Sequence, residues 1–206
     1  MLINIHPENP EQRKINTVTE CLNDGGVIIY PTDTVYALGC NAYNQKAIEK
    51  IYKIKKLDLK RHSLSLVCYD LSHISSFTKY LSNSTYKLMK KTLPGPYTFI
   101  LNANSNASKI FGNKKKEIGI RIPDNKIART IVKNFKNPIA TSSIKDNDVV
   151  LEYITKPELI YDQFKNKVDL IIDGGYGKKT PSTIINCTNE KPKVERIGKG
   201  DITVIF

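Results

Sequence analysis

The sequence predicts a single α/β domain. Its 206 residues fall within the size range of one compact domain with one hydrophobic core. Helical and strand patterns alternate along the chain, which is typical of a sheet covered by helices. One strand, residues 27–30, is a continuous apolar run, as expected for a strand that is covered on both faces. We therefore treat residues 1–206 as one domain.

In the first half of the chain, a helix over residues 10–23 begins with Asn9 and Pro10 as cap and first-turn pair and ends at Gly25. The buried strand follows it directly and is stopped by Pro31. Apolar periodicity and β-branched runs then predict, in order, a helix ending near Lys56, a strand at 64–67, a helix over 84–92 and a strand at 98–101.

The second half repeats this scheme. Strands are predicted at residues 118–122 and 139–142, a helix over 126–135, a helix over 157–165, and short strands at 170–172, 183–187 and 194–196. Two polar stretches, residues 102–116 and 145–153, are interpreted as loops within the domain.

The charge of the chain is its strongest compositional signal. There are 32 Lys and Arg residues against 20 Asp and Glu, a formal net charge of +12, so polyanions are the expected partners. Most of the cations are lysines beside many Asn and Ile residues, so part of the charge reflects codon composition. We interpret residues 114–116, three consecutive lysines, as a solvated loop.

Cysteine and histidine spacing predicts no metal site. The four cysteines and three histidines are dispersed along the sequence, without the close pairs that zinc sites need. Free, buried thiols are expected instead. Since no segment has the pattern of a secretory signal or a membrane span, we expect a cytoplasmic protein that does not contact membranes.

Residues 31–39, Pro-Thr-Asp-Thr-Val-Tyr-Ala-Leu-Gly, follow the buried strand and are the first candidate site. Ligands of α/β sheets collect at loops beyond strand ends, and the hydroxyls of Thr32 and Thr34 beside Asp33 could hold the polar groups of an amino acid or a metal-bound phosphate. A second interpretation is a turn capped by its own threonine or aspartate side chain.

Further motifs occur in order along the chain. They are Lys55, Leu-Pro-Gly-Pro-Tyr-Thr at 93–98, Gly-Ile-Arg-Ile-Pro at 119–123, Thr-Ser-Ser at 141–143 and Pro-Ser-Thr-Ile-Ile at 181–185. Over residues 21–200 the series resembles the YrdC-like threonylcarbamoyl-AMP synthase family. Residues 5–10 and 168–176 resemble its YciO subgroup in particular.

The resemblance implies a twisted mixed sheet with a positive cavity, and the synthesis of threonylcarbamoyl-AMP and pyrophosphate from threonine, bicarbonate and ATP, toward threonylcarbamoyladenosine in tRNA. By analogy, the residues expected to bind substrate or nucleotide are Thr32, Thr34, Lys55, Thr98, Arg121, Ser143, Ser182 and Arg196. Catalysis would rest on positioning and electrostatics, since no nucleophile with its base is evident. No tightly bound cofactor is expected, and Mg²⁺ could accompany ATP.

Two departures from the family pattern bear on activity. Leu57 stands where a Lys-x-Arg pair would place arginine, and Ile144 stands where a Ser-x-Asn signature would place asparagine. Each change could cost several kcal/mol of transition-state stabilisation, so weakened or lost synthase activity is expected. The alternative function is a non-catalytic module that binds double-stranded RNA by its shape.

Arg121 alternates with Ile118, Ile120 and Ile122 and so lies on the opposite face of its strand from these isoleucines. One interpretation makes it a bidentate phosphate ligand in the cavity. The other makes it a structural arginine paired with a carboxylate such as Asp33 or Asp173.

Overall fold

The computed structural model describes residues 1–58, 64–111, 116–144 and 155–205. In these residues one mixed sheet has the strand order β1-β8-β2-β3-β7-β4-β6-β5-β9-β10. The strands, in chain order, are β1 (Leu2–Asn4), β2 (Val27–Tyr30), β3 (Ala37–Asn41), β4 (Ser65–Val67), β5 (Tyr97–Asn102), β6 (Glu117–Arg121), β7 (Ile139–Ser143), β8 (Leu170–Asp173), β9 (Thr183–Asn186) and β10 (Lys193–Arg196).

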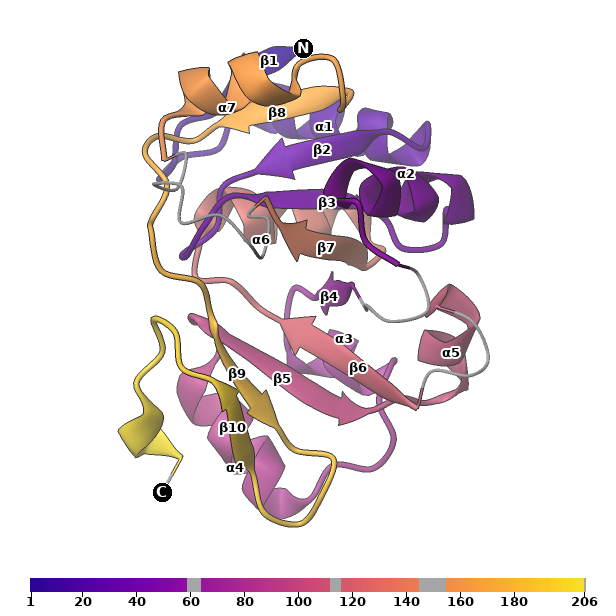
Figure 1. Ribbon diagram of the computed structural model, residues 1–206, viewed down its shortest axis with the longest axis vertical. Helices are drawn as coiled ribbons and strands as arrows, with labels where there is room; N and C mark the ends of the chain where they lie inside the picture. Colours follow the sequence, from indigo (N-terminus) through magenta and orange to yellow (C-terminus); the bar gives the residue numbers. More distant parts are fainter. Residues whose placement is uncertain (59–63, 112–115, 145–154, 206) are drawn as a thin grey trace.

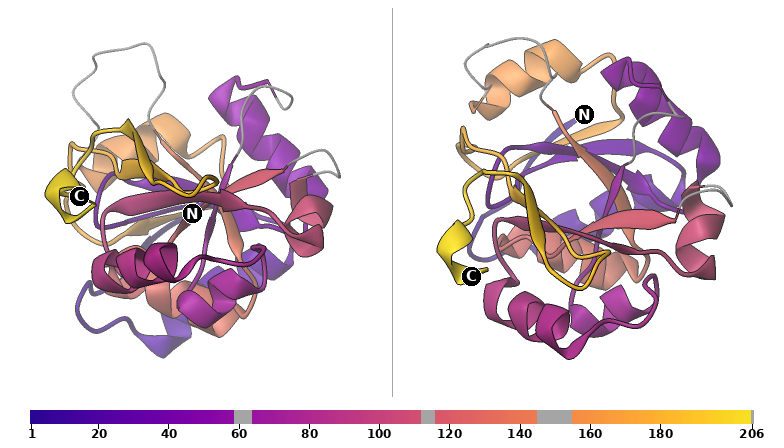
Figure 2. Two further views of the ribbon diagram at one scale, coloured as in Figure 1. Left: turned by 90° about the horizontal axis from the view of Figure 1, so that it is seen from below. Right: turned by 60° about the horizontal axis from the view of Figure 1, so that its bottom comes forward.

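Helices lie on both sides of this sheet (Figure 2). They are α1 (Gln12–Asn23), α2 (Gln45–Lys55), α3 (Leu71–Ser75), α4 (Asn83–Thr92), α5 (Ser105–Phe111), α6 (Lys126–Phe135) and α7 (Pro157–Phe164), with a 3-10 turn at Ile202–Val204. No helix in the described ranges is long and apolar enough to span a bilayer. All four cysteines are free thiols.

The core forms two clusters of buried side chains. The smaller cluster joins α1 and α6 to the strands around β2, through residues such as Ile15, Val18, Ile28 and Ile131. The larger cluster takes residues from the remaining helices and runs along most of the sheet. In Figure 1 one half of the molecule contains the strands β1, β8, β2, β3 and β7, and the other half contains β4, β6, β5, β9 and β10.

Local sequence explains the best-defined elements. Asn125 caps α6 by accepting a hydrogen bond from the N–H of Ala128, and Lys136 ends the helix in the left-handed conformation. Asn44 caps α2 in the same way, and Lys56 ends it with φ of 51°.

The loop between β2 and β3 is fixed by close packing. The two strands pair antiparallel, from Val27 opposite Cys40 to Tyr30 opposite Ala37. A Cβ atom on Gly39 would lie 2.8 Å from both the Tyr30 ring and the Ile139 side chain, so only glycine lets these side chains cover the strand. The Pro31–Tyr36 loop is therefore held by a rigid hairpin.

Several sequence-based boundaries are wrong. Asn9 does not cap α1; the cap position is Glu11 and the helix begins at Gln12. Strands β1 and β3 and helix α3 were not predicted from the sequence. It also interpreted residues 102–116 as a loop, whereas α5 lies within this stretch because Asn104 accepts hydrogen bonds from the N–H groups of Asn106 and Ala107. The predicted loop at 145–153 lies outside the described residues.

Candidate functional site

A cavity of about 580 Å³ opens where the two halves of the sheet meet. Strands from both halves and the end of α2 contribute to it. Its lining residues are Thr34, Val35, Ala37, Lys55, Lys56, Leu57, Ser65, Thr98, Arg121, Thr141, Ser142, Ser143, Pro181, Ser182, Ile184 and Arg196. Seven of the eight residues expected to bind ligand are thus brought together, and Thr32 is not in the lining.

Strand pairing explains how distant parts of the sequence converge. Thr98 of β5 lies opposite Ile184 of β9, and Ile184 lies opposite Arg196 of β10. In β6 the buried residues Ile118 and Ile120 alternate with Gly119 and Arg121, which confirms the predicted alternation. The cavity floor is therefore formed by four neighbouring strands, β6, β5, β9 and β10, each of which contributes a lining residue.

Cations dominate the charged side chains of the lining. Four lining residues are Lys or Arg, and no described lining residue is Asp or Glu. Lys55 and Lys56 lie at the end of α2, and Lys55 is only 8% exposed. Because the field of a charge is screened less in a partly enclosed site than in bulk water, the cavity favours anionic groups.

Hydroxyl groups cover the β5–β9 side of the cavity floor. The hydroxyl oxygens of Thr98 and Ser182 lie 2.8 Å apart. Arg196 donates to the Ser182 carbonyl from Nε at 3.2 Å and from Nη2 at 2.9 Å, and Nη2 also lies 3.3 Å from Ser182 Oγ. The arginine is therefore fixed on Ser182, and the hydroxyl pair retains hydrogen-bonding capacity for a ligand.

Thr141 continues this polar surface on β7. Tyr30 and Thr141 form a buried hydroxyl contact of 2.8 Å, and Thr141 donates to the Leu38 carbonyl. Since the single proton of Thr141 goes to that carbonyl, Tyr30 is the donor in the contact. Burial raises the pKa of Tyr30 to about 12, so the phenol keeps this proton at neutral pH.

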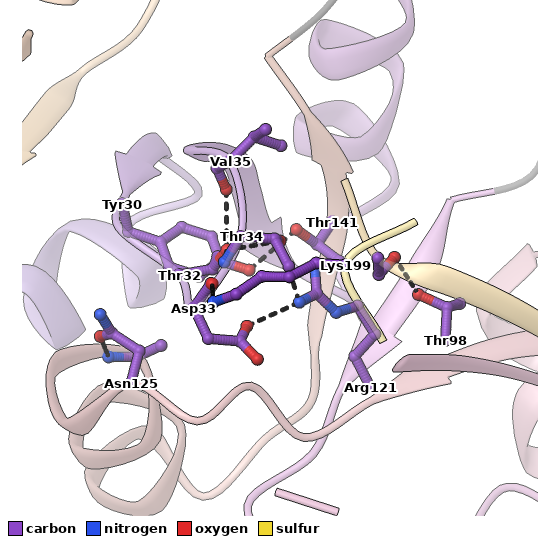
Figure 3. A network of polar contacts seen from close by, with 12 residues as sticks. Tyr30, Thr32, Asp33, Thr34, Val35, Thr98, Arg121, Asn125, Thr141 and Lys199 are labelled. Atoms are coloured by element: carbon purple, nitrogen blue, oxygen red, sulfur yellow. Dashed lines mark hydrogen bonds and ion pairs between the residues drawn. The ribbon is translucent and has the colours of Figure 1, made fainter. Parts of the chain in front are cut away.

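In the Pro31–Tyr36 loop, two threonines face each other (Figure 3). Thr32 Oγ1 accepts from the N–H of Thr34 at 3.0 Å and donates to the Val35 carbonyl at 2.7 Å. This is the capped turn of the second interpretation. Thr32 thus organises the loop, while Thr34 contributes to the cavity wall from a fully buried position.

Arg121 pairs with Asp33, as the structural interpretation expected. Its Nη2 lies 2.8 Å from Asp33 Oδ1 and 3.1 Å from Thr34 Oγ1 (Figure 3). The two charged side chains are 11% and 6% exposed. Among the described residues, Asp33 Oδ2 and Arg121 Nε have no hydrogen-bond partner.

Two residues at this site were missed by the sequence analysis. Lys199 donates from Nζ to the Asp33 carbonyl at 2.6 Å, and the N–H of Lys178 donates to the Thr34 carbonyl at 2.9 Å. Both lysines lie in glycine-containing segments of the last third of the sequence, and no motif distinguishes them from other lysines. They tie two late loops to the Pro31–Tyr36 loop.

The two departures from the family pattern occupy different places. Leu57 lies in the cavity wall directly after Lys55 and Lys56. Ile144 packs against the larger core cluster, and its N–H donates to the Tyr36 carbonyl. Leu57 thus presents an aliphatic side chain where an arginine would add a charge, whereas Ile144 adds to the packing beside β7.

No group of three or more His, Cys, Asp or Glu side chains suited to a metal occurs in the described ranges. His73 lies on α3, stacks on Tyr69 with ring centroids 4.3 Å apart, and is not in the cavity lining. Burial lowers the pKa of His73, as expected for an imidazole packed between aromatic rings.

The sequence is similar to one family of known proteins. Residues 20–198 match the model of the Sua5, YciO and YrdC family, whose description is telomere recombination. The YciO protein of Escherichia coli is 40% identical over 200 residues, which cover 96% of this chain and 95% of that protein. A threonylcarbamoyl-AMP synthase of Coxiella burnetii is 29% identical over 166 residues, 80% of this chain and 87% of the synthase.

Solved structures agree with the sequence relatives. The crystal structure of E. coli YciO superposes with a TM-score of 0.90 at 38% identity and covers the whole of this chain and 99% of its own. P. abyssi Sua5, in complex with L-threonine, has a TM-score of 0.86 at 26% identity over 96% of this chain and 57% of Sua5. The chain therefore belongs to the Sua5, YciO and YrdC family.

Proposed function

We propose that the cavity binds an adenine nucleotide, either ATP or an acyl-adenylate. The observation that carries this proposal is the composition of the lining, which combines four cations with seven Ser and Thr residues and has no carboxylate among its described members. Phosphates need cations and hydroxyl donors. A volume of 580 Å³ also lies within the range of roughly 300–1,000 Å³ that small-molecule sites occupy.

Within this proposal, the triphosphate contacts the cations of α2 and β10 and the hydroxyls of Thr98, Ser143 and Ser182. Lys55, Lys56 and Arg196 flank the floor on which Thr98 lies. Mg²⁺ would enter as part of the nucleotide complex, since no described lining residue is a carboxylate that would hold the ion alone.

An amino acid is the proposed second substrate. P. abyssi Sua5, which shares this fold, is complexed with L-threonine. Here we propose threonine and bicarbonate as companions of ATP, at the end of the cavity that Thr34 bounds. The threonine amine and bicarbonate would first combine to a carbamate with loss of water. A carbamate oxygen would then attack the α-phosphorus of ATP in line, forming the new P–O bond as the bond to pyrophosphate breaks, with the cations stabilising the charge that develops on the leaving group.

We further propose that this activity is weak. Leu57 lies in the cavity wall and cannot donate to a phosphate, and the partly buried Ile144 packs against the core where an asparagine would offer an amide. Loss of one donor to a developing charge typically lowers the rate about 100-fold to 1,000-fold. The fold and the cavity would thus be retained while the chemical step is slow.

Pyrophosphate release from ATP, with and without threonine and bicarbonate, tests this proposal. We expect a rate at least about 100-fold below that of the C. burnetii synthase, and a rise in the variant Leu57→Arg. Leu159→Arg, an exposed position on α7, is the matched control for added charge and should leave the rate unchanged. A threonine-dependent rate equal to that of the synthase would contradict weakened activity.

RNA binding is the second candidate function, favoured by the +12 net charge and by exposed lysines at the two late loops. Double-stranded RNA would be bound on the surface by its shape, because the cavity is too small for a duplex. A salt titration separates the candidates: RNA affinity falls steeply with salt because many phosphates are contacted, whereas nucleotide affinity falls weakly.

The proposed location is the cytoplasm. The free thiols and both proposed ligands, nucleotide and RNA, fit this location.

A further inference from the structure

The hydrogen bonds of Arg121 decide what it can offer to a ligand. Nη2 lies within hydrogen-bond distance of Asp33 Oδ1, at 2.8 Å, and of Thr34 Oγ1, at 3.1 Å. A guanidinium binds an anion bidentately through one of two forks, Nη1 with Nη2 or Nε with Nη2. Both forks include Nη2, whose two protons are used within the protein. Neither Arg121 nor Arg196, whose Nε and Nη2 both bond Ser182, therefore has an open fork for a phosphate, and Arg121 in addition contacts a carboxylate.

The charge of Arg121 is also compensated. Its side chain is 11% exposed and that of Asp33 is 6% exposed, so water screens this pair poorly. The carboxylate cancels much of the positive potential that the guanidinium would otherwise create in the cavity. Two of the buried atoms without a described partner, Asp33 Oδ2 and Arg121 Nε, belong to this same pair and are a complementary acceptor and donor.

The hydroxyl protons of the neighbouring loop have a fixed direction. Thr32 Oγ1 donates its proton to the Val35 carbonyl, so Thr34 must be the donor in the 3.0 Å contact between the two hydroxyls. Thr34 Oγ1 in turn accepts from Arg121. The chain of bonds runs from Arg121 through Thr34 and Thr32 to Val35, and Arg121 holds its first hydroxyl in place.

We propose that Asp33 is a positioning residue that acts through Arg121. It holds the guanidinium in contact with Thr34 and so keeps it from binding the anionic part of a ligand. The proposal rests on the nucleotide-binding function proposed above and deepens it. The phosphates are then bound at the α2 and β10 side of the cavity, and at the Thr34 side the charge of Arg121 is largely cancelled by Asp33. When the Asp33 carboxylate is removed, the charge of Arg121 is no longer cancelled and the positive potential in the cavity rises.

Titration with inorganic pyrophosphate measures the effect of this rise. In Asp33→Asn the amide oxygen still accepts from Arg121, but the negative charge is gone, and we expect pyrophosphate affinity to rise about threefold to tenfold. Asp162→Asn, which removes an exposed carboxylate paired with Lys165, adds the same net charge far from the cavity and should change the affinity less than about twofold.

In the double variant Asp33→Asn/Arg121→Gln the rise in pyrophosphate affinity should disappear, because the charge that causes the rise is that of Arg121. If Asp33 had a purely structural role, pyrophosphate affinity would not rise in any of these variants. Should Asp33→Asn fold poorly, Asp33→Ser keeps an acceptor oxygen without the charge and is expected to show the same rise. An unchanged or weaker affinity in the folded neutral variant overturns the proposal.

The two proposals fail separately. If the wild-type chain binds neither pyrophosphate nor ATP, the proposed nucleotide function fails, while a gain in Asp33→Asn that the double variant abolishes still supports the role of Asp33. If the wild-type chain binds both ligands and Asp33→Asn binds pyrophosphate more weakly, then Arg121 is itself an anion ligand and the assignment of Asp33 is wrong.

Discussion

Thr98 of β5 and Ser182, directly before β9, place their hydroxyl oxygens 2.8 Å apart on the cavity floor. Thr98→Val removes one hydroxyl and keeps the shape of the side chain. We expect ATP affinity to fall about threefold to tenfold, since one hydrogen bond to a ligand contributes about 1 kcal/mol. Calorimetric titration of ATP measures the change.

The control for this prediction is Thr188→Val, beyond the far end of β9. Thr188 donates to Asn186 and is not in the cavity lining, so its loss should leave ATP affinity unchanged. Equal affinities of the two variants would show that the Thr98 hydroxyl takes no part in nucleotide binding.

Gly119 of β6 allows Ser65 of β4 to occupy the cavity wall. The two residues pair across the strands, and a Cβ atom on Gly119 would lie 2.6 Å from Ser65 Oγ. Gly119→Ala should therefore lower the free energy of unfolding by about 1–3 kcal/mol, as overpacking does. Urea denaturation measures this loss.

Removal of the clashing atom provides the matching test. In Ser65→Ala/Gly119→Ala the hydroxyl oxygen is absent, so most of the lost stability should return. If the double variant is as unstable as the sum of the two single variants, the close approach to Ser65 is not the cause.

Asp169 joins β2 to α2, since its carboxylate accepts from the N–H of Val27 at 2.7 Å and from Lys50 Nζ at 2.8 Å. Burial acts to raise the pKa of Asp169, but the Lys50 ammonium and the Val27 N–H outweigh it and hold the pKa below its usual value. The stability from this ionised carboxylate is thus present above about pH 4 and is lost as the pH falls through the lowered pKa.

Thermal unfolding of Asp169→Asn at two pH values checks this linkage. At pH 7 the variant should melt a few degrees below the wild type, and at pH 3 the difference should shrink. Because the pair is partly exposed, added salt should also reduce the difference at pH 7. A difference that is the same at both pH values would mean that ionisation of Asp169 does not contribute.

The sequence predicted those elements whose stability is local. The predicted helix over residues 126–135 coincides with α6, because an apolar stripe lies within the segment and the Asn125 cap directly precedes it. In contrast, β3 contains Gly39, and its place in the sheet depends on packing against Tyr30 and Ile139, which no local pattern shows. Likewise Asn9 and Pro10 suggested a cap at Asn9, but the cap position is Glu11 and α1 begins at Gln12.

The sequence predicted which residues line the cavity better than it predicted the hydrogen bonds that each residue makes. Motif order indicated Thr98, Ser143, Ser182 and Arg196, and strand pairing brings these residues to one cavity. Sequence could not tell that Thr32 turns its hydroxyl to the Val35 carbonyl, nor choose between the two interpretations of Arg121. Those roles depend on side-chain hydrogen bonds between segments about 90 residues apart or within a tight loop, which spacing alone does not fix.

The ATP affinity of two charge variants on β10 tests the central proposal most directly. Arg196 lines the cavity, whereas Lys193 lies on the same strand with a side chain that is 75% exposed. Arg196→Gln and Lys193→Gln remove the same charge. We expect ATP affinity to fall at least about tenfold in Arg196→Gln and less than about twofold in Lys193→Gln. Equal small losses in both variants would contradict nucleotide binding in this cavity and would favour a diffuse basic surface.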